Sequence, residues 1–346
     1  MSAIGSFETD YETATERCGL LDSSERGKLA LTGSGAKEFL QGQVSNDVLA
    51  LTPGMGCYAA LLTPKGKMLG DLRILDTGEE LLLDTERAAL QELFDMIRRF
   101  SIGHDVELHK RTLECALLSL IGPAADDVVA AAASAPSVVG APSVTPTPSV
   151  VGAHSVTPTP SVAPTDTEHA HVAGHLGRTS VRLIRTDTGI DVLCASDAVE
   201  AVRGVLLDAG AGEVGELAAE CVRIERGRPR YGIDLDDSVI PQEAGLNERA
   251  VSFSKGCYVG QETVARLFYR GKPNRHLRGL RSSEPIPPGT SLVHAGREVG
   301  RVTSSATSPR LGPIALALVR REAPIGAVVD AGAGGEAEVV ALPFSD

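Results

Sequence analysis

Tryptophan is absent from this chain of 346 residues, and aromatic residues make up only 3% of it. Long apolar runs are absent too, because no segment offers the roughly 20 apolar residues that a membrane-spanning helix needs. The N-terminal stretch MSAIGSFETDYETATER is acidic and lacks the apolar core of a secretory signal. We therefore expect a cytoplasmic protein that has no membrane partner.

Paired cysteines are also missing. Six cysteines are dispersed along the chain without a CxxC pair, at positions 18, 57, 115, 194, 221 and 257. Dispersed cysteines favour reduced thiols over a disulfide framework or a zinc site. We expect five of them to be small core residues and treat Cys257 separately.

Several motifs that would identify an enzyme class are absent. The segment TGSGAKEFL (32–40) lacks the GK[ST] ending of a phosphate loop, so we interpret it as a turn that leads into a helix. No GxSxG or HExxH hydrolase motif is present. His169, His171 and His175 lie close together beside a Pro-rich tract, where we expect them to be solvated. We therefore predict no metal site.

The chain as a whole lacks an excess of positive charge, and its formal net charge is -12. This excludes a general binder of nucleic acids or anionic membranes. The segment 255–281 is the exception, with seven Lys or Arg and one Glu. It predicts either an ordinary solvated surface, a funnel for a small anionic ligand, or an RNA contact. We do not favour the RNA contact.

A Pro-rich repeat divides the sequence. The unit PSVVGAPSVTPT (136–147) is followed by the nearly identical PSVVGAHSVTPT (148–159). Such a repeat cannot bury enough apolar surface to offset its chain entropy, so we predict a disordered insertion over 124–177. The insertion separates two ordered parts of the chain.

The ordered parts follow similar patterns. Residues 72–99 and 181–210 each predict a strand, a Gly turn, a second strand and an amphipathic helix. After residue 273, short β-like runs broken by Gly and Pro predict a small barrel or sandwich. The fold class is therefore α+β. We predict an N-terminal part over 1–123, a second part over 178–272 and a C-terminal β-barrel over 273–346.

The segment KGCYVGQE (255–262) concentrates reactive side chains. Gly256 and Gly260 allow a sharp turn around Cys257, and the ammonium group of Lys255 would favour the thiolate. The alternative is a buried cysteine in a Gly-rich turn. A second candidate is Glu225, which is either an exposed helix residue or a carboxylate directed into a cleft.

These motifs resemble the YgfZ family, which comprises folate-binding proteins that support iron-sulphur enzymes and tRNA modification. That family is related to the glycine-cleavage T-protein, an aminomethyltransferase. The resemblance includes KGCYVGQE, GAKEFLQGQVSNDV (35–48), TPKGKMLGDLRI (63–74), RIERGRPRYGIDL (223–235), IPQEAGLN (240–247) and VGRVTSSATSP (299–309). It covers nearly the whole chain outside the insertion.

The resemblance implies a three-domain GcvT/YgfZ-like cloverleaf around a central folate channel, with a small C-terminal β-barrel. Tetrahydrofolate or a one-carbon derivative is the implied cofactor, and iron-sulphur proteins or their assembly machinery are the implied partners of a monomer. Cys257 and Lys255 are the implied catalytic residues. The expected cofactor-binding residues are Glu225, Arg223, Tyr58, Tyr231, Tyr258, Gln261, Glu262 and Arg266.

The chain departs from the T-protein pattern at one position that bears on catalysis. Where the resemblance places an aspartate in an Asn-Ala-x-x-x-x-Lys-Asp pattern, this chain has Gln91, which cannot ionise. Whether the protein is an enzyme is therefore left open. The alternative to a role in iron-sulphur maintenance is a folate-dependent aminomethyl or methyl transferase, in which Asp71 or Asp84 replaces the missing carboxylate.

Overall fold

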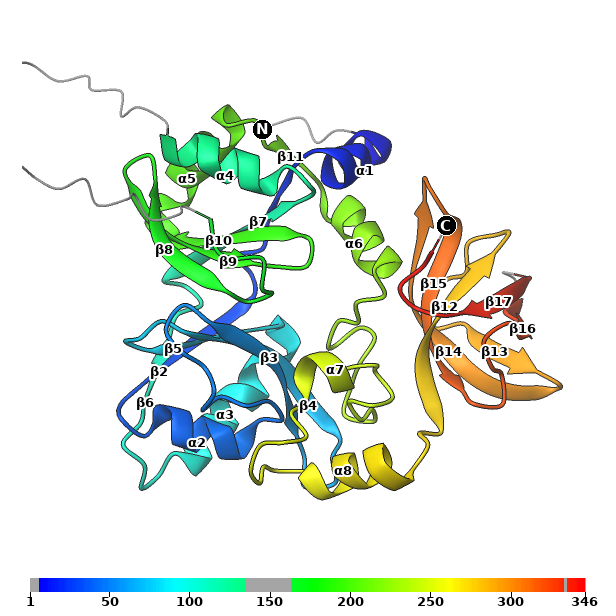
Figure 1. Ribbon diagram of the computed structural model, residues 1–346. Helices are drawn as coiled ribbons and strands as arrows, with labels where there is room; N and C mark the ends of the chain where they lie inside the picture. Colours follow the sequence, from blue (N-terminus) through cyan, green and yellow to red (C-terminus); the bar gives the residue numbers. More distant parts are fainter. Residues whose placement is uncertain (1–5, 135–162, 333–334, 346) are drawn as a thin grey trace, which may run out of the picture.

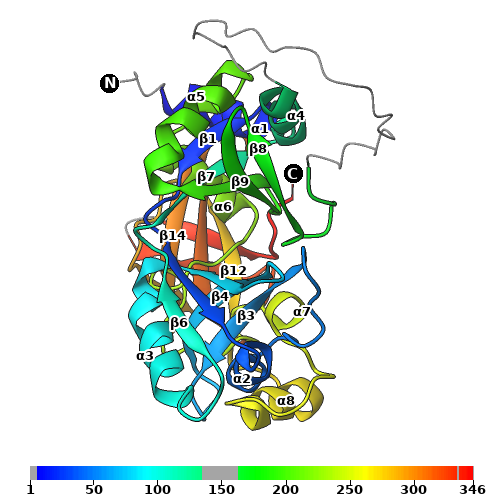
Figure 2. The same cartoon turned by 90° about the vertical axis from the view of Figure 1, so that its left-hand side faces the viewer.

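The computed structural model describes residues 6–134, 163–332 and 335–345. Two α+β lobes and a barrel surround a central region (Figure 1). Seen from the side, the two lobes are stacked and the barrel strands lie behind them (Figure 2). The Pro-rich repeat at 136–159 lies outside the described residues.

The five-stranded lobe is built on an antiparallel sheet in the order β3-β4-β5-β2-β6. Its strands are β2 (Gly27–Thr32), β3 (Gly56–Leu62), β4 (Met68–Asp76), β5 (Leu81–Thr85) and β6 (Glu107–Lys110). The helices α2 (Ala36–Gln43) and α3 (Leu90–Phe100) pack on one face of this sheet, where Phe39, Leu93 and Ile97 enter its core. The opposite face meets the other lobe through Ala30 and Ile184.

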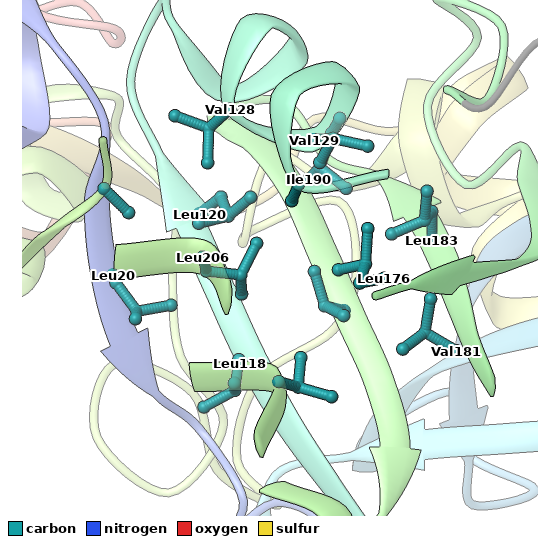
Figure 3. Close-up of a cluster of buried hydrophobic side chains, with 14 of the residues drawn as sticks. Leu20, Leu118, Leu120, Val128, Val129, Leu176, Val181, Leu183, Ile190 and Leu206 are labelled. Atoms are coloured by element: carbon teal, nitrogen blue, oxygen red, sulfur yellow. The ribbon is translucent and has the colours of Figure 1, made fainter. Parts of the chain in front are cut away.

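The six-stranded lobe is assembled from both sides of the insertion. Its sheet has the order β11-β1-β7-β10-β9-β8. The strands are β1 (Gly19–Asp22), β7 (Cys115–Ile121), β8 (His171–Leu176), β9 (Thr179–Arg185), β10 (Gly189–Ala195) and β11 (Gly212–Glu213). The helices α4 (Ala125–Ser134) and α5 (Val199–Asp208) bury Val128, Val129 and Leu206 against Leu118 and Ile190 (Figure 3). Each such side chain contributes roughly 1.5–3 kcal/mol through burial.

The C-terminal part is a closed six-stranded barrel, as the Gly-punctuated β pattern predicted. Its strands are β12 (Arg275–Ser282), β13 (Ser291–His294), β14 (Arg297–Ser308), β15 (Gly312–Arg320), β16 (Val328–Asp330) and β17 (Glu336–Val340). Closure leaves no open sheet edge.

Four further helices connect these parts. They are α1 (Phe7–Glu16), α6 (Glu216–Glu225), α7 (Asn247–Ala250) and α8 (Gln261–Arg270), and two 3-10 turns, η1 (Arg87–Ala89) and η2 (Ser196–Ala198), precede α3 and α5. Helix α6 packs against α1 and the barrel strands β14 and β15, so it joins the barrel to the lobes. None of the described helices is both long and apolar enough to cross a bilayer.

The two predicted strand-turn-strand-helix units are confirmed, as β4-β5-α3 and β9-β10-α5. The predicted domain boundaries need correction, however. The limit at residue 123 cuts through a sheet, because β1 and β7 pair with β11 and β10. The predicted insertion over 124–177 is also too wide. Residues 125–134 form α4 and residues 171–176 form β8, because Val129 and Leu176 fill the core of the six-stranded lobe.

Candidate functional site

A polar cavity of about 310 Å³ lies at the centre of the molecule, between the two sheets and α6. Ten Asp or Glu residues and seven Arg residues line it. Most of these charges are paired with one another across its walls. An apolar ligand would find little surface to bury there, so the cavity suits a polar ligand that offers both donors and acceptors.

Strand alternation places the polar side chains of the five-stranded sheet in this cavity. Ala60 is opposite Asp71, Tyr58 is opposite Arg73, and Arg73 is opposite Asp84. Residues that are opposite each other or two apart share one face of a sheet. Tyr58, Asp71, Arg73 and Asp84 therefore all point to the same side, which faces the cavity.

Asp71 is a carboxyl group in this cavity whose proton affinity is increased by its surroundings. It is 6% exposed, and burial raises its pKa to about 6. The hydroxyl of Tyr58 donates a hydrogen bond to Asp71 Oδ2 at 2.6 Å, which partly offsets that increase. A carboxyl group with a pKa near neutrality can both accept and release a proton.

Asp84 lies nearby, but its pKa is shifted in the opposite direction, below its ordinary value. Its carboxylate accepts from Arg26 Nε at 2.9 Å and pairs with Arg73 Nη2 at 2.8 Å. Burial acts to raise the pKa of Asp84, but the two guanidinium groups lower it below its ordinary value. Arg73 also pairs with Asp191 of β10 at 2.8 Å, so this buried cluster joins the two sheets. Asp84 therefore stays ionised.

The segment after the insertion forms a further wall of the cavity. Glu168 forms an ion pair with Arg249, and the His169 ring lies 6.4 Å from the Tyr58 ring. The prediction that these histidines are solvated is wrong for His169 and His171. Both are largely buried, and burial lowers their pKa values to about 3 and about 4. Among the described residues, no group of His, Cys, Asp or Glu is placed to hold a metal ion.

A second cavity, of about 1050 Å³, opens on the other side of α6. The two cavities share six lining residues, among them Asp187 and Arg226. Arg226 Nη1 donates to the Asp187 carbonyl at 2.7 Å and Arg228 Nε to the Asp187 carboxylate at 2.5 Å. The turn between β9 and β10 is thereby held against the end of α6, where the cavities meet.

Glu225 lies in this outer cavity and not in the central one. Its buried carboxylate accepts a hydrogen bond from Tyr11 Oη at 2.7 Å, another from Ser308 Oγ, and one from Arg310 Nη2 at 3.3 Å. These partners come from α1 and from the barrel. Of the two alternatives for Glu225, the buried carboxylate is correct, but it is occupied by contacts that hold three parts of the protein together.

Comparison with known proteins identifies the family. The GCVT N-terminal domain model matches residues 3–141, and the glycine cleavage T-protein C-terminal barrel model matches residues 275–346. The chain is 30% identical over 352 residues to an aminomethyltransferase of Geobacillus kaustophilus (strain HTA426), spanning 99% of this chain and 91% of that protein. The chain belongs to the aminomethyltransferase family.

Other aminomethyltransferases are similarly close. That of Bacillus subtilis (strain 168) is 27% identical over 336 residues, which span 94% of this chain and 86% of the relative. The crystal structure of the glycine cleavage system aminomethyltransferase T from Bartonella henselae superposes with a TM-score of 0.80 at 23% identity, over 98% of this chain and 89% of that one. The predicted fold class, α+β with a small C-terminal barrel, is confirmed.

The predicted site residues of this aminomethyltransferase-family chain do not gather in one place. Tyr58 and Arg223 line the central cavity, and Glu225 lines the outer one. Arg223 is engaged in ion pairs with Glu220 at 2.5 Å and Asp234 at 2.7 Å. Its neighbour Glu225 faces the other way, because residues two apart on a helix do not share a face.

The expected pairing of Lys255 with Cys257 does not form. Lys255 is buried, and its ammonium donates to the carbonyls of Gln41, Val44 and Asn46 at 2.6, 2.7 and 2.8 Å. An ammonium group has three donors, so these bonds use all of them. Lys255 thus fixes its loop to the end of α2, while Cys257 is exposed.

The other expected cofactor-binding residues lie away from both cavities. Tyr258 is buried beneath Lys255, and Tyr231 packs in the same apolar cluster. Gln261, Glu262 and Arg266 lie on α8, which lies at the lower edge of the molecule in Figure 1, below α7. No residue of 255–281 lines either cavity. Of the alternatives for the basic segment, a funnel for an anionic ligand is therefore not formed at either cavity, because its charges are used in local contacts or lie on α8.

Position 91 has no bearing on the cavity. Gln91 is exposed on α3, where its amide donates to Asp95 at 2.9 Å. The lack of a carboxylate there leaves the central cavity unchanged. The cavity residues that the sequence reasoning missed include Arg26, Arg73, Glu168, Asp191 and Arg249. Arg73 could have been found, because charged residues two apart in the apolar strand MLGDLRILD indicate one polar, buried face.

Proposed function

We propose that this protein is a tetrahydrofolate-dependent one-carbon transferase, which takes an aminomethyl or methyl group from an amine donor. The observation that supports this most directly is Asp71. It is a buried carboxyl group with a pKa of about 6, hydrogen-bonded to Tyr58 in the central cavity of an aminomethyltransferase fold.

The residues present fit tetrahydrofolate. Carboxylates on the cavity wall can accept hydrogen bonds from the amino group and ring N–H groups of a pterin, and arginines can pair with the carboxylates of its glutamate tail. Ligand pockets usually measure about 300–1,000 Å³. The central cavity of about 310 Å³ matches the small end of that range, and the adjoining cavity of about 1050 Å³ can take the longer tail.

Tetrahydrofolate, when bound, supplies the nitrogen atoms that receive the one-carbon group. Asp71, whose pKa lies close to the working pH, would accept the proton that the attacking nitrogen loses and deliver a proton to the amine that leaves. Tyr58 holds the Asp71 carboxyl group in one orientation. Asp84 does not share this role, because Arg26 and Arg73 keep it ionised and occupied.

The test uses purified protein, tetrahydrofolate and a panel of aminomethyl and N-methyl amine donors, with formaldehyde equivalents or methylated folate as the product. We expect turnover in the wild type and a loss of at least about 100-fold in Asp71→Asn, the usual size of a proton-transfer contribution. Asp95→Asn, on the exposed face of α3, is the matched control. Equal turnover in Asp71→Asn and the wild type would refute the role of Asp71.

A second candidate function is the maintenance of iron-sulphur enzymes, as in the YgfZ family. It is supported by Cys257, an exposed thiol in the KGCYVGQE turn, which Lys255 anchors to α2. In this case Cys257→Ala keeps the fold and tetrahydrofolate binding but does not restore iron-sulphur enzyme activity in a strain that lacks the protein. Full rescue by Cys257→Ala would exclude this role.

A further inference from the structure

The wall formed by residues 163–170 is attached firmly to the body of the protein. Arg185 of β9 forms a bidentate pair with Asp126, at 2.9 and 2.7 Å, and donates to the carbonyls of Pro164 and Thr165. The backbone of His169 also bonds to the Arg185 carbonyl. These contacts fix the point from which Glu168 extends into the central cavity.

A chain of contacts leads from Glu168 to Asp71. The carboxylate of Glu168 forms an ion pair with Arg249, and among the described residues it is the only ion-pair partner of that guanidinium group. Arg249 lies over the Tyr58 ring, 5.3 Å from its centroid. The Tyr58 hydroxyl then donates to Asp71 at 2.6 Å.

Each contact in this chain restricts the next side chain. A guanidinium over a tyrosine ring is attracted to the ring face and limits its rotation. The Tyr58 hydroxyl can reach Asp71 only when its ring stays in place. Asn46 supports the same arrangement, because its amide donates to the backbone carbonyls of both Tyr58 and Arg249.

We propose that Glu168 is a positioning residue, which through Arg249 holds the Tyr58 hydroxyl on Asp71 and so sets the proton affinity of the carboxyl group that the reaction uses. The inference rests on the proposed function for the role of Asp71 in catalysis. The effect on its proton affinity is a property of the protein alone.

Four side chains and burial together set the proton affinity of Asp71. Tyr58 faces it from β3, Asp84 and Glu86 from the end of β5, and Arg26 from the approach to β2. Burial and the two acidic groups raise the pKa of Asp71, whereas Tyr58 and Arg26 lower it. Glu168 is not among the principal groups that shift the pKa of Asp71, so we expect its larger effect to pass through Arg249 and Tyr58.

The sign of the change separates positioning from direct electrostatics. Removing the negative charge of Glu168 would, acting through space, lower the pKa of Asp71. Loss of the Tyr58 hydrogen bond, which stabilises the ionised carboxylate, would raise it. Glu168→Gln keeps the size of the side chain and removes only the charge, so the direction of its effect is decisive.

The experiment is a carboxyl-carbon NMR titration of full-length protein labelled with ¹³C at aspartate, with the Asp71 signal assigned by its absence from Asp71→Asn. Tyr58→Phe should raise the pKa of Asp71 by about half a unit to one unit, the equivalent of one hydrogen bond. Glu168→Gln should raise it by a smaller amount in the same direction. Glu248→Gln, an exposed carboxylate beside Arg249, is the matched control and should leave it unchanged.

Arg249→Lys provides a second variant, because it keeps the charge but loses the flat guanidinium over the ring. It should also raise the pKa of Asp71. A lowered or unchanged pKa of Asp71 in both Glu168→Gln and Arg249→Lys would overturn the inference. Calorimetric titration of the same variants with tetrahydrofolate tests the proposed function separately, since a wild type that binds no tetrahydrofolate would still give the Asp71 titration.

Discussion

Replacing Asp71 with asparagine removes a buried charge and leaves the shape of the side chain almost unchanged. At pH 7 the folded protein must keep this carboxyl group largely ionised although it is 6% exposed. Its pKa rises from 3.8 in the unfolded chain to about 6 in the folded one. The folded state therefore binds the proton more tightly than the unfolded state does.

The direction of the pH effect follows from this difference. For a group whose folded pKa is raised, its stabilising contribution is complete below the unfolded value of 3.8 and is lost as the pH rises through about 6. At about 1.36 kcal/mol per pKa unit, the ionisation of Asp71 lowers the free energy of unfolding by about 3 kcal/mol at pH 7.5. At pH 4.5 the loss is about 1 kcal/mol, because only the unfolded chain is then largely ionised at this position.

Asp71→Asn should therefore be more stable than the wild type by up to about 3 kcal/mol at pH 7.5, although it loses activity. The advantage should shrink to about 1 kcal/mol at pH 4.5. Urea unfolding followed by circular dichroism measures both values, because the chain has no tryptophan to report by fluorescence. Asp95→Asn, with an exposed carboxylate, should show no such pH-dependent gain. A variant that is less stable at pH 7.5, or a gain that is equal at both pH values, would show that the Asp71 charge does not destabilise the folded state.

Three further predictions concern the contacts between the parts of the protein. Lys255→Met should lower the free energy of unfolding by about 3 kcal/mol in urea titrations, because it leaves three carbonyl acceptors inside the protein without their donor; unchanged stability would show that the loop needs no anchor. Arg73→Leu should lower the free energy of unfolding by about 3–5 kcal/mol, because it leaves Asp191 buried without its ion-pair partner. In a thermal scan, the double variant Arg73→Leu/Asp191→Leu should recover part of the melting temperature that Arg73→Leu loses. Glu225→Ala should lower stability by about 2 kcal/mol yet raise the tetrahydrofolate dissociation constant by less than roughly threefold in calorimetry; a rise of tenfold or more would instead support a direct contact with the pterin.

Local patterns were enough to predict most of the secondary structure. Alternation and Gly turns predicted the β4-β5-α3 and β9-β10-α5 units, and the short runs after residue 273 predicted the barrel. These signals depend on neighbours in sequence, so they can be read without knowledge of the fold. The sheet pairing does not, because β1 and β7 join strands that lie beyond the insertion.

The candidate site was harder to predict for the same reason. Lys255 and Cys257 are two residues apart, yet the lysine donates to backbone carbonyls at and just after the end of α2, and the cysteine is exposed. Arg223 and Glu225 also lie two apart, and they face different cavities. Proximity along the chain therefore gave a misleading picture of which side chains act together.

What the sequence determined by itself was the α+β class, the C-terminal barrel and the absence of a membrane-spanning run, which rest on composition and local periodicity. Its motifs added the resemblance to a known family. Only the tertiary structure decided which carboxylate can carry a proton. Asp71 and Asp84 are both buried aspartates on one face of one sheet. Arg73 of β4 and Arg26, which precedes β2, keep Asp84 ionised, whereas burial beside Tyr58 leaves Asp71 with a pKa of about 6. That difference depends on groups that only folding brings together.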